Sequence, residues 1–287
     1  MHFDSQALWL LNISLAVILF GMALELSVKD FRSINTYSKG IVSAIIFQLV
    51  ILPIVLVFAT NYAFQNKLYA VAILLILLCP GGNMSNFLTF LAKGDVILSL
   101  LITAITTLLS IVSIPFLYTF YTGYIFDNEN IVLKINSMEV VLHILLLLFL
   151  PLCIGVGIRY FRPLVAHNLL KVLKPLSLLI FAAFIIIVFA SNASIFIEYF
   201  NKIFLLVGVI HLITFFLPYL FHRYVMNLSG AESKAISMEL SIRNAALGLF
   251  LSLTYFKDIE IIAIICGWWG IYQLIAGYVY AHFLKSR

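Results

Sequence analysis

A series of apolar stretches, each near 20 residues long and separated by short polar breaks, constrains this chain more than any other feature. A helix needs about 20 apolar residues to cross a hydrocarbon core of roughly 30 Å. Because backbone polar groups in lipid must bond internally, spans of this length are helical. The chain is therefore predicted to be an all-α membrane protein with about nine transmembrane helices. They cover residues 7–26, 40–60, 68–91, 96–121, 138–158, 175–197, 203–222, 234–256 and 259–284.

Composition excludes several other classes of protein. With 64% hydrophobic and 10% charged residues, the chain has too little polar surface to coat a soluble globule of 287 residues. The 17 Lys and Arg outnumber the 12 Asp and Glu but are sparse, so they do not indicate nucleic-acid binding. Three cysteines without metal-ligand spacing predict neither a disulfide framework nor a zinc site. Residues 1–26 lack a basic region ahead of the apolar stretch, so we expect a retained span there and not a secretory signal.

Lysine and arginine gather in alternate loops between the stretches. Since these residues accumulate in cytoplasmic loops, the rich side is predicted to be cytoplasmic. Nine spans then place the N-terminus outside and the C-terminus inside, in the inner membrane if the protein is bacterial. The rich side holds Lys29, Arg32, Lys39, Lys93, Arg159, Arg162, Lys171, Lys174, Arg223, Lys234, Lys285 and Arg287. The other side holds only Lys67, Lys134, Lys202 and Lys257.

The third stretch is interrupted by Cys79-Pro80-Gly81-Gly82-Asn83-Met84-Ser85-Asn86. Proline removes a backbone donor and clashes with the preceding turn, and two glycines lower helix propensity further. These residues predict a broken helix at residues 80–86. Broken backbone at membrane depth is tolerated only where it is buried in protein or lines a wet cavity, so the break itself indicates a site.

The eighth stretch carries two charged residues, Glu239 and Arg243. Each such charge costs about 2.5–3.5 kcal/mol at the centre of a spanning helix, so the two must face a cavity, bind an ion or pair with each other. Glu followed four residues later by Arg is a favourable intrahelical pair, which leaves a purely structural alternative open. Ionisable residues inside membranes are more often functional, and we expect a second broken helix near residues 239–244.

The two interrupted stretches occupy matching positions in the chain. Residues 1–121 would hold four spans and residues 138–287 five, joined by an external loop at residues 122–137. Each interrupted span is second to last in its half, yet the two run in opposite directions. This arrangement is typical of an inverted repeat, in which two discontinuous helices cross near mid-membrane and build the substrate and ion sites.

Three motifs extend this interpretation. They are Phe20-Gly21-Met22-Ala23-Leu24-Glu25-Leu26 followed by Asp30-Phe31, the run from Cys79-Pro80-Gly81-Gly82 through Ser85-Asn86 to Leu91-Ala92-Lys93-Gly94-Asp95, and Glu239 followed by Asn244. Together they resemble the bile acid:sodium symporter family, over essentially the whole chain. The resemblance implies a sodium-coupled carrier of organic anions with a panel domain, a core domain, two crossed discontinuous helices and two sodium sites. Nine spans would match the animal members of that family.

Carried over by position, the first sodium site of the family falls on oxygen-bearing side chains. These are Ser85, Asn86, Ser99, Thr103 and Glu239. Sodium is a hard cation that prefers such oxygens, as calcium and magnesium do. For Ser99 and Thr103 the alternative is hydrogen bonding between helices, which is common for hydroxyls in membranes.

The second sodium site is where the chain departs from the family. Its ligands would include Gln48 and a glutamine at the position that Arg243 occupies here. A guanidinium has donors only, so it cannot ligate sodium and would repel one nearby. We therefore expect one sodium, with Arg243 in place of the second. Ser241 stands where the family tends to have glycine, which makes local unwinding of this span less favourable.

The resemblance also implies substrate-facing positions at Asn83 and Asn244. An amide can hydrogen-bond a carboxylate or hydroxyl without adding charge, although buried Asn between helices can equally serve packing. In the last span the family often has a His-Asn pair, whereas this chain has Trp268-Trp269-Gly270-Ile271, and Gln273 is the nearest polar candidate.

These observations predict a secondary active symporter that carries a small organic anion, bile-acid-like or a keto or hydroxy acid, by alternating access. Sodium would be the coupling ion, with no other cofactor and the lipid bilayer as surroundings. One alternative is a sodium-independent or proton-coupled carrier, in which Arg243 neutralises Glu239 or binds the substrate carboxylate. Another is an intramembrane enzyme or sensor, for which the isolated His143, His211, His222 and His282 offer no paired metal ligands.

Overall fold

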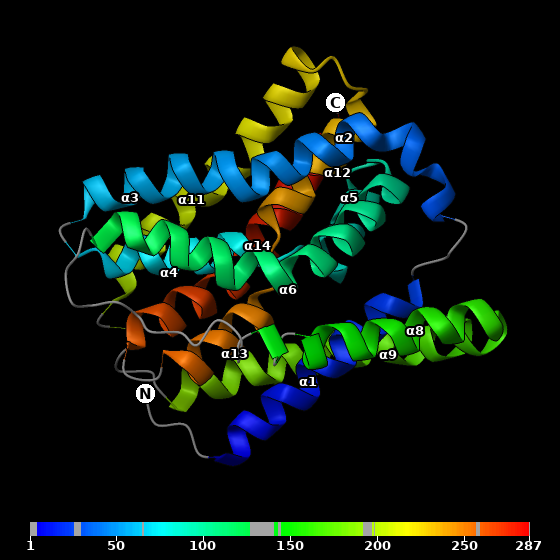
Figure 1. Cartoon of the computed structure of the whole chain (residues 1–287), viewed down its shortest axis with the longest axis horizontal. Helices are drawn as coiled ribbons and strands as arrows, with labels where there is room; N and C mark the ends of the chain where they lie inside the picture. The colour runs from blue at the N-terminus through cyan, green and yellow to red at the C-terminus, as the bar shows by residue number, and fades with distance from the viewer. Residues whose placement is uncertain are drawn as a thin grey trace.

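The structure is a computed structural model that describes residues 5–25, 30–64, 66–126, 141–142, 145–191, 197, 199–256 and 259–286. Within these residues the regular elements are all helices and there is no strand (Figure 1). The prediction of an all-helical protein is therefore confirmed for the described part of the chain. His143, Lys134 and most of the predicted external loop at residues 122–137 lie outside it.

The helices follow the apolar stretches of the sequence. Their bounds are α1 Ser5–Glu25, η1 Asp30–Ser33, α2 Ile34–Ile46, η2 Phe47–Ile51, η3 Pro53–Val57, α3 Phe58–Ala63, α4 Leu68–Leu78, α5 Asn83–Leu91, α6 Val96–Phe126, η4 Leu145–Phe149, α8 Leu150–Phe161, α9 Pro163–Ser191, α11 Phe200–Leu220, η5 Phe221–Val225, α12 Gly230–Ser241, α13 Ala245–Tyr255 and α14 Glu260–Lys285. Segments η2 to η5 are single π-helical stretches that continue neighbouring α-helices, and η1 is a 3-10 turn.

Several of these helices are long and apolar enough to cross a membrane. Five stretches in the described residues meet this condition: Phe31–Ala63, Val96–Ile125, Ile203–Val225, Gly230–Tyr255 and Glu260–Lys285. The pair α4 and α5 makes a sixth if it is one span, bent by 73° at its break. The chain is thus an integral membrane protein, while the number of nine spans and the side on which each terminus lies stay predictions.

Helices α9 and α12 begin before the spans that were predicted for them. α9 begins at Pro163, where the fixed φ of proline suits the first helical position, and Pro175, the predicted start, lies inside the helix. α12 begins at Gly230 instead of residue 234, because Ser229 and Glu232 form a capping box. The Ser229 hydroxyl accepts from the Glu232 amide at 3.2 Å, and the Glu232 carboxylate accepts from the Ser229 amide at 2.9 Å.

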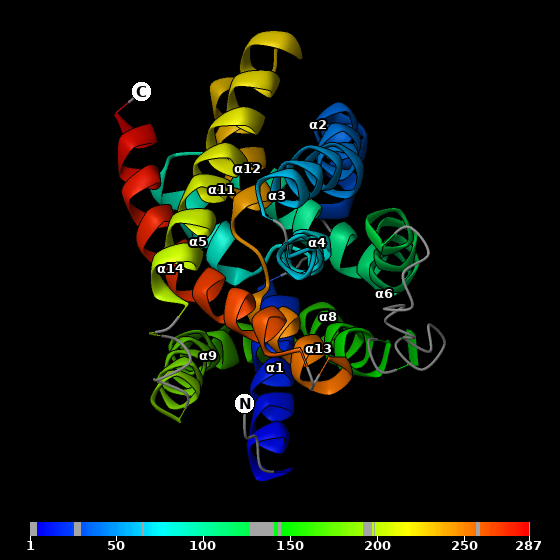
Figure 2. The same ribbon diagram turned by 90° about the vertical axis from the view of Figure 1, so that its left-hand side faces the viewer.

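Helices α1, α8 and α9 pack on one another as one group, in the lower right of Figure 1. Gly155 of α8 allows the close approach, since a Cβ there would lie 2.4 Å from the Cβ of Ala23 in α1. A second group surrounds α4. Figure 2 looks nearly along α4 and shows α3, α6, α13 and α14 around it, in agreement with their contacts.

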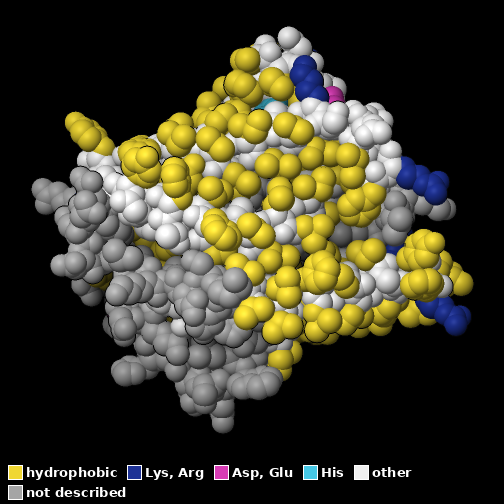
Figure 3. Space-filling view, in the orientation of Figure 1, with side chains coloured by type: hydrophobic (Ala, Val, Ile, Leu, Met, Phe, Trp, Pro, Cys, Tyr) yellow, Lys and Arg dark blue, Asp and Glu magenta, His cyan; other side chains and the backbone are white. Residues whose placement is uncertain are grey.

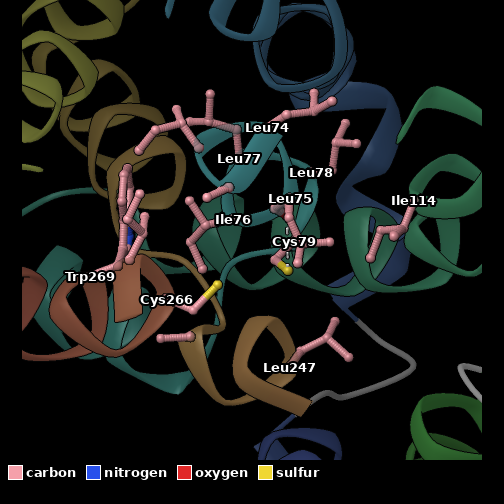
Figure 4. Close-up of a cluster of buried hydrophobic side chains, with 14 of the residues drawn as sticks. Leu74, Leu75, Ile76, Leu77, Leu78, Cys79, Ile114, Leu247, Cys266 and Trp269 are labelled. Carbon is pink, nitrogen blue, oxygen red and sulfur yellow. Dashed lines mark hydrogen bonds between the residues drawn. The ribbon is translucent and has the colours of Figure 1, made fainter. Parts of the chain in front are cut away.

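The helix α4 is the most enclosed element of the structure. Its residues from Tyr69 to Leu78 are all buried, as expected of a helix that is hydrophobic on every side. Figure 4 shows its side chains in one cluster with Trp269 of α14, Leu247 of α13 and Ile114 of α6. This packing fixes the end of α4, and with it the position of the first helix break.

Candidate functional site at the two helix breaks

The first break separates α4 from α5. Pro80 has no amide hydrogen to continue the helix, and the chain runs extended from Cys79 to Gly82. The break is shorter than the predicted 80–86, because α5 resumes directly after Gly82. Ser85 and Asn86 therefore lie in the first turn of α5 and not in the break.

The second break separates α12 from α13. α12 ends at Ser241, and Ile242 takes up an extended conformation (φ −89°, ψ 110°). Glu239 is therefore in the last turn of α12, and the break covers residues 242–244 in place of the predicted 239–244. The side-chain oxygen of Asn244 caps α13 by accepting from the Leu247 amide at 3.1 Å. The chain unwinds although Ser241 replaces the family's glycine.

The two breaks touch each other. The Asn244 amide donates to the Pro80 carbonyl at 2.8 Å. Gly81 lies against the carboxylate of Glu239, so that a Cβ on Gly81 would fall 1.8 Å from Oε1. A side chain of any size at this position must displace the carboxylate.

Four oxygen-bearing side chains from α5 and α6 converge around Glu239 of α12, which is fully buried, and with it they make five. Thr103 donates to its Oε1 at 2.5 Å, and Ser99 lies 3.1 Å from its Oε2. The Ser99 hydroxyl is also 2.7 Å from Asn86 Oδ1, and Thr103 is 3.4 Å from the same atom. The Ser85 hydroxyl lies near the carboxylate and donates to the Gly82 carbonyl at 2.6 Å. We call these five residues the oxygen cluster.

The oxygen cluster has the chemistry of a site for a hard cation. Carboxylate, amide and hydroxyl oxygens are the ligands that such ions prefer. Within the described residues, the Glu239 carboxylate is bonded by hydroxyl groups and forms no ion pair with a basic side chain. Because a buried charge is costly without compensation, a cation at this point would stabilise the carboxylate.

One further residue joins the cluster and was not predicted. Thr89 is fully buried, and its hydroxyl lies 3.3 Å from the Ser99 hydroxyl. It follows Ser85 and Asn86 by one turn on the same face of α5. That spacing is visible in the sequence and could have identified it.

The two residues of the second cation position also come together, at the carbonyl of Cys79. Gln48 Nε2 donates to this oxygen at 3.3 Å and Arg243 Nη1 at 3.4 Å. Both side chains are buried. Arg243 Nε and Nη2 and Gln48 Oε1 have no hydrogen-bond partner in the described structure. A fixed positive charge thus lies beside the oxygen cluster.

The intrahelical pair of Glu239 with Arg243 is not formed. α12 ends at Ser241, so the spacing of four residues no longer places the two side chains on one helical face. The guanidinium donates to the Cys79 carbonyl and the carboxylate accepts from hydroxyls. The two buried charges are therefore not neutralised by a direct ion pair with each other.

The three predicted substrate residues do not meet at one point. Asn83 is partly buried and its Nδ2 donates to the Ile18 carbonyl of α1 at 3.4 Å, so it faces the group formed by α1, α8 and α9. Gln273 Oε1 accepts from the Arg243 amide at 2.9 Å. Asn244 caps α13. Asn244 and Gln273 thus support the backbone around Arg243, and Asn83 lies at the boundary between the helix groups.

His211 and His222 contact side chains of other helices. His211 packs on Trp269 with ring centroids 4.2 Å apart, and His222 bonds to Ser43 at 2.8 Å. The described residues contain no group of three His, Cys, Asp or Glu side chains that could hold a metal ion.

Comparison with known proteins agrees with this geometry. The profile of the sodium bile acid symporter family matches residues 12–199. The chain belongs to this family. It is similar to the uncharacterized sodium-dependent transporter YocS of Bacillus subtilis, with 30% identity over 265 residues that cover 90% of this chain and 79% of that protein.

Two further relatives bear names that state a cargo. The probable chloroplastic sodium/metabolite cotransporter BASS1 of Arabidopsis thaliana is 26% identical over 270 residues, which cover 94% of this chain but only 65% of that protein. The human ileal sodium/bile acid cotransporter is 31% identical over 163 residues, 56% of this chain and 46% of that protein. Since the relatives are transporters, the prediction of a transporter and not an enzyme is confirmed.

Proposed function

We propose that the chain is a sodium-coupled symporter of a small organic anion. The observation that carries this proposal is the Glu239 carboxylate, fully buried where the two breaks meet and bonded by hydroxyl groups. A sodium ion would compensate its charge, and the surrounding oxygens suit that ion. The names of the relatives support sodium coupling and a bile acid or another metabolite as the cargo. Within that class, we propose a bile-acid-like acid or a small keto or hydroxy acid.

One sodium binds at Ser85, Asn86, Ser99, Thr103 and Glu239 in this proposal. Arg243 lies with Gln48 at the Cys79 carbonyl and supplies the positive charge that a second sodium ion would carry. Arginine stays protonated at any physiological pH, so this charge does not leave with the cargo.

Transport proceeds by alternating access between the two helix groups. α1, α8 and α9 act as a panel, and the helices around α4 act as the core of an inverted repeat. Among the predicted substrate residues, Asn83 faces α1 across the boundary, so its contacts would change when the two groups move. Nine spans with the N-terminus outside complete the proposed topology.

Thermal unfolding in detergent tests sodium binding. Sodium, and not potassium, should raise the melting temperature, because a ligand that binds only the folded state adds to stability. Glu239→Ala should abolish this rise and Ser99→Ala should weaken it. Ser252→Ala is the matched control, since Ser252 is equally buried but donates to the Leu249 carbonyl in α13. If the parent protein melts identically with and without sodium, the sodium-independent carrier is the better account.

A further inference from the structure

An apolar groove lies between α6 and α8, apart from the helix breaks. Its volume is about 570 Å³. It is lined by one face of α8 between Phe149 and Phe161, by Ala104 and Leu108 of α6, and by Phe31 of η1. No residue of the oxygen cluster or of the second cation position lines this apolar groove.

The length of the groove matches one leaflet of a bilayer. Along η4 and α8 the lining residues recur every three or four positions, as Phe149, Leu152, Val156 and Tyr160. At 1.5 Å per residue this face is about 16 Å long. Half of a hydrocarbon core is roughly 15 Å thick. An extended acyl chain of one leaflet therefore fits along it.

Among the described residues, positive charge lies at one end of the groove. Arg32 follows the lining residue Phe31, while Arg159 and Arg162 flank Tyr160 and Phe161 at the end of α8. The opposite end, at Phe149 and Leu108, is apolar. Figure 3 likewise shows Lys and Arg side chains at the border of a broad hydrophobic surface. The groove thus has the polarity of an anionic lipid.

We propose that the groove holds an acyl chain of an anionic phospholipid, with its phosphate against the arginines. The mouth of the groove faces the surroundings of the protein, because Leu108 is 39% and Phe161 76% exposed. Large apolar side chains exposed in this way lie in hydrocarbon when the protein is in a bilayer. This proposal goes beyond anion transport and does not depend on sodium coupling.

Photocrosslinking in lipid nanodiscs tests the proposal. The full chain is reconstituted in phosphatidylcholine with a trace of phosphatidylglycerol that carries a photoreactive group in its acyl chain. Peptides spanning residues 149–161 should be crosslinked. Gly157→Trp should lose most of this signal, because Gly157 lines the groove and a Cβ there meets no atom within 4 Å. Gly123→Trp is the matched control, with equally open space on α6 but outside the groove.

Three results would overturn the proposal. One is equal crosslinking in the parent and Gly157→Trp, checked with the smaller Gly157→Leu if the tryptophan variant fails to fold. The second is equal crosslinking by photoreactive phosphatidylcholine, because the parent should prefer phosphatidylglycerol. This preference should vanish in the double variant Arg32→Gln with Arg159→Gln. The third is displacement of the lipid probe by dissolved taurocholate, which would make the groove a cargo site.

Discussion

Gly81 illustrates at the scale of single residues how closely the broken helices meet. A Cβ at this residue would overlap the Glu239 carboxylate, whereas a Cβ at the neighbouring Gly82 meets no atom within 4 Å. The sequence indicates both glycines only as helix breakers. Which of them also makes room for a carboxylate follows from a contact between distant parts of the chain.

Gly81→Ala should therefore abolish the sodium-dependent rise in melting temperature, because the added methyl group displaces the carboxylate from the oxygen cluster. Gly82→Ala should retain it, since its backbone is extended (φ −154°) and the space is open. Thermal unfolding of both variants with sodium and with potassium measures the difference. Equal behaviour of the two variants would contradict the assigned role of Gly81.

The side-chain types of the oxygen cluster could be predicted, but their partners could not. Ser99, Thr103 and Glu239 carry oxygens at positions that the family resemblance indicates, and the structure brings them together. Asn244 was assigned to the substrate from the family resemblance, and Gln273 as the nearest polar residue of the last span. Their oxygens instead accept from backbone amides, and sequence alone does not reveal which donor an amide will meet.

At the scale of helices, proline, glycine and charge predicted that two spans are broken, but not where each half begins. Helix ends depend on caps, such as the Ser229 box at α12 and Asn244 at α13. The π-helical segments were not predicted either. η2 and η5 pack together through Phe47 and Phe221, whose ring centroids are 4.8 Å apart. Such segments arise from packing between helices and leave no periodic signal in the sequence.

Asn244 caps α13 and was also predicted to bind the substrate, and substitutions can separate these two roles. Asn244→Ala should destabilise the protein by about 1 kcal/mol, because the amide of Leu247 loses its acceptor. Asn244→Ser retains a capping oxygen and should recover most of that stability. Unfolding and substrate uptake are measured on both. Normal uptake by the serine variant would show that the Asn244 amide does not bind the cargo.

At the scale of the whole molecule, topology follows from the distribution of basic residues. Cysteines placed at Ser5 and Ser286 should be labelled from opposite sides of intact cells, with Ser5 outside. Cys153 is exposed and is replaced by serine in the parent, whereas Cys79 and Cys266 are buried and can remain. Labelling of both positions from the same side would rule out nine spans.

The net charge proposed where the two breaks meet can be compared with that of a family member that binds two sodium ions. Two sodium ions and one glutamate leave such a site net positive and ready to attract an anion. In the proposed function, one sodium, Glu239 and Arg243 give the same net charge. The equivalence is electrostatic only, because the arginine cannot dissociate and cross with the cargo.

Coupling should therefore fall to one sodium per transport cycle, which sodium titrations of substrate binding can measure. The parent should respond without cooperativity, with a Hill coefficient of about one. Arg243→Gln should restore a second site and make the response cooperative, because an amide oxygen can ligate sodium. Arg243→Ala should weaken anion binding, because it removes the charge without offering a ligand. A cooperative sodium response in the parent would refute the proposal that arginine replaces the second sodium. Loss of substrate binding in Arg243→Gln at every sodium concentration would instead show that the arginine binds the anion directly.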